Sequence, residues 1–75
     1  MSKKEYLYIT FHNTLDAMTA ENLYKTHQIS GRLVAIPSEL SAGCGMAWRS
    51  EPNEQTHIEE VSKQAQLSLN QIAIL

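Results

Sequence analysis

The chain has 75 residues, of which 43% are hydrophobic, and it carries a formal net charge of −2. This length is close to the lower limit for a domain with its own core, so we expect a single domain over residues 1–75. No stretch approaches the ~20 apolar residues of a membrane-spanning helix, and the acidic balance disfavours a protein that binds the phosphate backbone of nucleic acids.

The first half of the chain predicts a strand, a helix and a second strand. Residues 6–12 alternate with a period of two, which is typical of a strand. One face of this strand carries Leu7, Ile9 and Phe11, and the other carries Tyr6, Tyr8, Thr10 and His12. Asn13 or Thr14 caps a helix over residues 15–27, whose apolar positions are Ala17, Met18, Ala20, Leu23 and Tyr24. Gly31 opens a second strand over residues 32–36, which Pro37 ends because proline lacks an N–H donor.

The second half predicts a loop, a strand, a helix and a last strand. The loop covers residues 37–43, and the third strand covers residues 45–49, with Met46 and Trp48 facing the helices. Pro52 suits the first position of a helix, whose apolar positions are Ile58, Val61 and Ala65. Residues 67–75 predict a fourth strand. The order βαββαβ indicates an α+β, ferredoxin-like sandwich, with four antiparallel strands and two helices on one face.

Cys44 is the single cysteine, and it has a glycine on each side, Gly43 and Gly45. It therefore has no intramolecular disulfide partner, and a thiol that stays free favours the reducing cytoplasm. Flanking glycines leave a sulfur atom uncovered and permit the positive-φ backbone that aims N–H groups at an anion. A reactive thiolate needs both properties. The alternative is a tight turn in which the cysteine has no chemical role.

The predicted topology brings other side chains to this loop. The loop lies at the same end of the sheet as His12, Asn13 and Thr14, where a helix start offers unpaired N–H groups to an anion. Arg32 and Arg49 are the cations closest to the loop in sequence. His12 and Arg49 each have a structural alternative: His12 also fits a half-exposed strand end, and Arg49 also fits a solvated position or a salt bridge on the open sheet face.

Other kinds of chemistry find little support. The histidines and Cys44 lack the spacing of metal ligands, so we expect no metal, and no glycine-rich phosphate loop or other cofactor motif is present. Tyr6 and Tyr8 on the open face suit base stacking, but the third strand offers Gly45, Ala47 and Arg49 there instead of aromatic residues. We therefore expect no nucleic acid partner, and we expect the open face to serve a homodimer or another protein.

The same residues carry a resemblance that covers roughly residues 6–66. The chain resembles the small selenium/sulfur carrier protein-like domain family in Thr14, Asp16-Ala17, Ala20-Glu21, Gly31-Arg32-Leu33, Pro37-Ser38-Glu39-Leu40-Ser41, Cys44-Gly45-Met46-Ala47 and Arg49. The resemblance implies a carrier whose cysteine, at Cys44, holds sulfur or selenium from a donor such as a cysteine desulfurase. The chain departs from the usual pattern at two positions. Ser38 stands where the family often has a basic residue, and Trp48 stands where the family often has a small aliphatic residue. It also lacks the Cys-Pro-x-Pro motif of better-known sulfur-relay proteins.

Three functional hypotheses follow. The first is a carrier without enzymatic activity, in which Cys44 accepts sulfur or selenium from a protein donor and passes it to an acceptor enzyme. The second is an interaction or regulatory module that uses the open face around Tyr6 and Tyr8. The third is a redox sensor, in which Cys44 forms a sulfenic acid or an intermolecular disulfide.

Overall fold

The computed structural model describes residues 5–40 and 45–75 of the chain. In these ranges the strands are β1 (Leu7–Thr10), β2 (Arg32–Ala35), β3 (Met46–Ser50) and β4 (Gln71–Ile74). The helices are α1 (Thr14–Thr26) and α2 (Gln55–Gln64), and a short 3₁₀ helix, η1 (Pro52–Glu54), precedes α2. The element order is therefore the predicted one, with boundaries that differ by a few residues.

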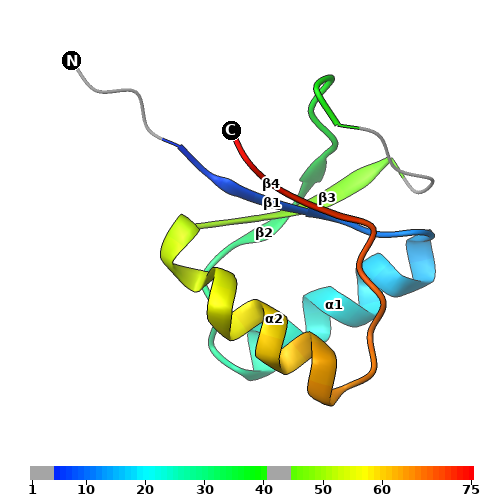
Figure 1. The fold of residues 1–75 in the computed structure, drawn as a ribbon. Coiled ribbons are helices and arrows are strands. Elements are labelled where there is room, and N and C mark those ends of the chain that lie inside the picture. Colours follow the sequence, from blue (N-terminus) through cyan, green and yellow to red (C-terminus); the bar gives the residue numbers. More distant parts are fainter. Residues whose placement is uncertain (1–4, 41–44) are drawn as a thin grey trace.

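The strands form one sheet in the order β2-β3-β1-β4, and all neighbouring strands are antiparallel. Because β3 lies between β1 and β2 and is antiparallel to both, these two strands run parallel to each other. Both α-helices cover the same face of the sheet (Figure 1). The predicted ferredoxin-like sandwich is confirmed. None of the described helices combines the length and apolar character that crossing a lipid bilayer requires.

The core lies between the sheet and the helices. The predicted inner face of β1 is confirmed, because Leu7, Ile9 and Phe11 are all fully buried. Ile9 pairs with Trp48 on β3, and the Trp48 indole contacts the Tyr24 ring of α1 edge to face, with 5.3 Å between ring centroids. Burying such large aromatic side chains is the main stabilising contribution in a domain of this size.

The first helix begins at its cap. The Asn13 side chain accepts a hydrogen bond from the backbone N–H of Asp16 at 2.8 Å, so Asn13, and not Thr14, is the capping residue. Ala17, Ala20 and Tyr24 are buried on one stripe of the helix. Met18 does not belong to this stripe and is 56% exposed, because one residue step turns it about 100° away from Ala17.

The second helix differs from its prediction at both ends. Pro52 opens the turn η1, and α2 starts only at Gln55. Ile58 and Val61 are buried as predicted, but Ala65 is exposed because it ends the helix.

Ser62 takes a buried place in α2 that its polar character did not predict. It is buried because its hydroxyl forms a hydrogen bond of 2.7 Å with the Tyr24 hydroxyl of α1. The bond joins the two helices inside the core, where an unpaired hydroxyl would be costly.

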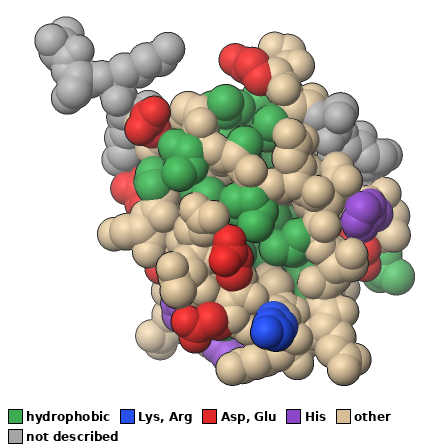
Figure 2. Space-filling model, viewed as in Figure 1, with side chains coloured by type: hydrophobic (Ala, Val, Ile, Leu, Met, Phe, Trp, Pro, Cys, Tyr) green, Lys and Arg blue, Asp and Glu red, His purple; other side chains and the backbone are tan. Residues whose placement is uncertain are grey.

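The last strand is shorter than the predicted range of residues 67–75. Leu67 and Leu69 precede β4 and pack against the core from outside the strand. Ile72 also packs against the core, from within β4. Figure 2 shows hydrophobic side chains gathered in the middle of the view, over the region that β4 crosses in Figure 1. Ile74 and Leu75, at the end of the chain, are exposed.

Candidate functional site

The loop that carries Cys44 joins β2 to β3. The last described pair at this end is Ala35 with Met46, and the N–H of Ile36 donates to the carbonyl oxygen of Gly45 at 3.1 Å. Gly43 and Cys44 lie outside the described residues. The predicted contact between the thiol and residues 12–14 therefore stays a prediction.

The surroundings of this loop are described on both sides. Thr10 pairs with Ala47, so residues 12–14, which follow β1, and Gly45, which precedes β3, lie at the same end of the sheet. His12, Asn13, Thr14 and Gly45 are all exposed. Gly45 has a φ of +73° and open space where a side chain would stand, so the positive-φ backbone predicted beside Cys44 is present at this glycine.

The helix start at this end is partly occupied by its own cap. The Asn13 side chain takes up the N–H of Asp16, while no described residue accepts a hydrogen bond from the N–H groups of Thr14 and Leu15. These two groups could receive an anion at the positive end of the helix dipole. The Asp16 carboxylate in the first turn competes for that place.

The arginines lie elsewhere. Arg32 and Arg49 are direct partners across β2 and β3, three residue steps from the pair Ala35–Met46. At the usual rise of a strand, this separation is about 10 Å. The predicted site residues thus form two groups, one at the Cys44 loop and one at the far end of the β2–β3 pair.

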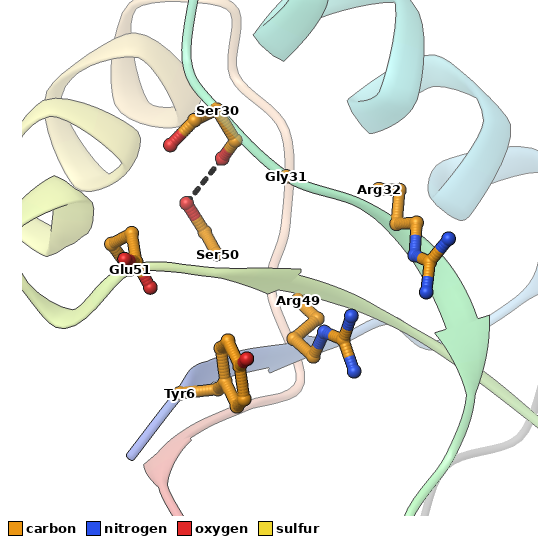
Figure 3. A pocket seen from close by; sticks show the side chains of 7 residues that line it. All are labelled: Tyr6, Ser30, Gly31, Arg32, Arg49, Ser50 and Glu51. Atoms are coloured by element: carbon orange, nitrogen blue, oxygen red, sulfur yellow. Dashed lines mark hydrogen bonds between the residues drawn. The ribbon is translucent and has the colours of Figure 1, made fainter. Parts of the chain in front are cut away.

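A pocket of about 410 Å³ lies at this second group (Figure 3). It is lined by Tyr6, Ser30, Gly31, Arg32, Arg49, Ser50 and Glu51. The Arg49 guanidinium carbon lies 4.6 Å from the centroid of the Tyr6 ring, which is cation–π geometry. Arg49 therefore rests on an aromatic ring on the open face of the sheet, and it forms no salt bridge with another residue in the ranges 5–40 and 45–75.

The wall of the pocket is held by hydrogen bonds. The Ser50 hydroxyl donates to the carbonyl oxygen of Ser30. The N–H and hydroxyl groups of Ser30 donate to one carboxylate oxygen of Glu54, at 2.9 and 3.1 Å. These bonds join the start of β2 to the end of β3 and to η1, so the pocket has a fixed rim.

A sequence model of the family described as "Putative Se/S carrier protein-like" matches residues 6–74. The chain belongs to this family. The match covers almost the whole chain, including Cys44, and confirms the resemblance predicted from the sequence. No curated protein and no solved structure matches the chain.

In this Se/S carrier-family protein, Gly31 shapes the pocket in a way that the sequence did not reveal. Its φ is +138°, and a Cβ atom there would collide with the carbonyl oxygen of Arg49 and lie 3.0 Å from the indole nitrogen of Trp48. Only glycine lets the chain pass so close to β3. The position of Gly31 directly before a strand was visible in the sequence, but its neighbours depend on the pairing of β2 with β3.

The tyrosines of the predicted interaction face are both partly buried. Tyr6 lies under Arg49, and Tyr8 pairs with Arg49 on one side and Ala73 on the other. Among residues 5–40 and 45–75, no three His, Cys, Asp or Glu side chains come together as a metal site would require.

Proposed function

We propose that this protein carries a sulfur or selenium atom on Cys44, from a protein donor such as a cysteine desulfurase to an acceptor enzyme. The observation that carries the proposal is the family match over residues 6–74, because Cys44 is the only thiol in the matched range. The protein acts as a carrier and not as an enzyme. A single thiol that must stay free suits the reducing cytoplasm.

The transfer needs no external oxidant. The Cys44 thiolate attacks the terminal sulfur of a persulfide on the donor protein, the donor's S–S bond breaks, and the donor cysteine leaves as a thiolate. A new S–S bond then holds the sulfur on Cys44, with the proton of the terminal sulfur carried along. In the transfer to the acceptor, a thiolate of the acceptor attacks the terminal sulfur, the S–S bond on Cys44 breaks, and Cys44 leaves as a thiolate. Selenium follows the same scheme.

The described neighbours of the loop support this role. Gly45 is exposed, and there is open space where its own side chain would stand, which suits the approach of a donor sulfur to this end of the loop. His12 supplies an imidazole at the same end of the sheet, and Thr14 and Leu15 supply backbone N–H groups. We propose that these groups stabilise the persulfide anion of Cys44.

A docking surface for the protein partners is also available at this end. Leu15 and Met18 lie one helical turn apart at the start of α1 and are 73% and 56% exposed. Exposed apolar side chains of this size favour contact with another protein. We propose that donor and acceptor dock on this turn of α1 and on the loop from Pro37 to Gly45.

Intact-mass measurement tests the carrier role. The protein is incubated with a cysteine desulfurase and cysteine, and we expect a mass increase of one sulfur atom that a thiol reductant removes. Cys44→Ser should gain no mass. An unchanged mass of the wild type during desulfurase turnover, or equal loading of Cys44→Ser, would contradict the proposal.

Two further variants separate the chemistry from the docking. His12→Gln should load more slowly, while His27→Gln, at the far end of α1, should load like the wild type. Leu15→Ser should slow loading from the protein donor but leave loading from inorganic polysulfide unchanged. If polysulfide loading falls equally in Leu15→Ser, the docking role of this turn is wrong.

A further inference from the structure

The two arginines of the chain, its only ones, stand directly opposite each other on β2 and β3. Like charges in this position repel and destabilise a sheet. Among the described residues, no carboxylate forms an ion pair with Arg32, and Arg49 is engaged with the Tyr6 ring. The repulsion is therefore not offset by an acidic neighbour of Arg32, and a bound anion would relieve it.

The geometry of the pair suits an anion. Figure 3 shows the guanidinium groups of Arg32 and Arg49 on the same side of the sheet, with Glu51 at the other end of the lining. The Tyr6 ring holds the Arg49 guanidinium in place, which lowers the entropy that binding would cost. Planar guanidinium groups match the oxygen atoms of phosphates and carboxylates, often through two parallel hydrogen bonds.

The size of the pocket indicates what kind of molecule carries the anion. A volume of about 410 Å³ falls in the range of small-molecule sites and exceeds the needs of a single phosphate or carboxylate group. The remainder of the ligand would lie along Gly31 and Ser50. The Ser50 hydroxyl already donates to the carbonyl oxygen of Ser30. Ser50 therefore forms part of the pocket wall and does not bind the anion.

We propose that this pocket binds a small molecule bearing an oxyanion, with the oxyanion held between Arg32 and Arg49. The two arginines lie about 10 Å along the strands from the pair Ala35–Met46, where the described part of the β2–β3 pairing ends. The proposal goes beyond the carrier function and does not depend on it.

Titration with simple anions tests the site on the full chain. Inorganic phosphate and malonate represent the two oxyanion classes, and sodium chloride keeps the ionic strength constant. We expect saturable shifts of the arginine side-chain N–H signals in NMR spectra and a rise in Tm. Arg32→Gln and Arg49→Gln should each weaken binding at least about tenfold, as expected for loss of a charge-assisted hydrogen bond.

Lys63→Gln is the matched control, because it removes one positive charge from α2, on the helical side of the sheet. It should bind like the wild type, and so should Cys44→Ser, which separates this site from the carrier function. Tighter binding of phosphate or of malonate identifies the class of oxyanion. The absence of saturable binding of both anions would overturn the proposal, and so would an equal loss in Lys63→Gln. Circular dichroism verifies that each variant is folded.

Discussion

Trp48 and Arg49 are neighbours in the chain, yet they belong to two different regions of the molecule. Trp48 points to the closed face of the sheet, where it is fully buried between the strands and Tyr24. Arg49 points to the open face, where it lies beside Arg32 and over Tyr6. Because side chains alternate along a strand, one short strand supplies both the core and a charged pocket.

This difference teaches where stability and chemistry reside in a domain of this size. The closed face holds the apolar side chains whose burial stabilises the fold. The open face keeps two like charges side by side, which lowers stability unless they have a ligand. Substitutions on the two faces should therefore change the free energy of unfolding by different amounts, and in some cases with opposite sign.

The largest effect is expected on the closed face. Trp48→Ala should lower the free energy of unfolding by about 3–5 kcal/mol, because it removes the largest buried side chain and leaves a cavity. Urea unfolding followed by circular dichroism measures this loss. Trp48→Phe, which keeps a ring, should lose less. A loss below about 1 kcal/mol for Trp48→Ala would mean that the core does not depend on this residue.

The next largest effect is expected where the two faces meet. Gly31→Ala should lower the free energy of unfolding by about 2–4 kcal/mol, because the new Cβ collides with the backbone of Arg49. Gly45→Ala is the control, since it also has positive φ but meets open space. It should cost only about 1–2 kcal/mol. Equal losses in urea unfolding would contradict the close approach at Gly31.

A smaller effect concerns the bond between the helices. Tyr24→Phe removes the hydrogen bond to Ser62 and leaves a buried hydroxyl unpaired, so we expect a loss of about 1–2 kcal/mol. Tyr24→Phe with Ser62→Ala should restore part of this loss, because no polar group then remains unpaired. Urea unfolding of the single and double variants checks the expectation, and a double variant less stable than Tyr24→Phe would contradict it.

The same residue gives a pH dependence. Burial raises the pKa of Tyr24 above its ordinary value of 10.0, and the hydrogen bond with Ser62 opposes this rise only in part. Since the unfolded tyrosine ionises at a lower pH than the folded one, this contribution to stability is complete below pH 10 and is lost as pH rises through the folded pKa. In thermal unfolding between pH 9 and pH 11, the Tm of Tyr24→Phe should therefore fall less with rising pH than the Tm of the wild type.

The smallest effect has the opposite sign. Arg32→Gln removes the charge repulsion on the open face and should raise the free energy of unfolding by about 0.2–1 kcal/mol at low salt. The gain should shrink as salt screens the charges of the wild type. Lys63→Gln, measured alongside, should show no comparable gain. A destabilised Arg32→Gln would indicate that this side chain has a structural role.

The sequence alone determined the order of the elements and the inner face of β1. A period of two places Leu7, Ile9 and Phe11 on one face whatever the neighbours are, and a capping residue marks the helix start. The family resemblance was also predictable from motifs along the chain, and the family model matches residues 6–74. These features are local, so they can be predicted without knowing which strands pair.

The tertiary structure decided the rest. Ser62 is buried only because Tyr24 of the other helix reaches it, and Met18 is exposed because the direction in which α1 packs leaves it outside. The arginine pocket depends on the register that places Arg32 opposite Arg49. Register and packing join residues that are distant in the chain, and a shift of one residue would send these side chains to the other face.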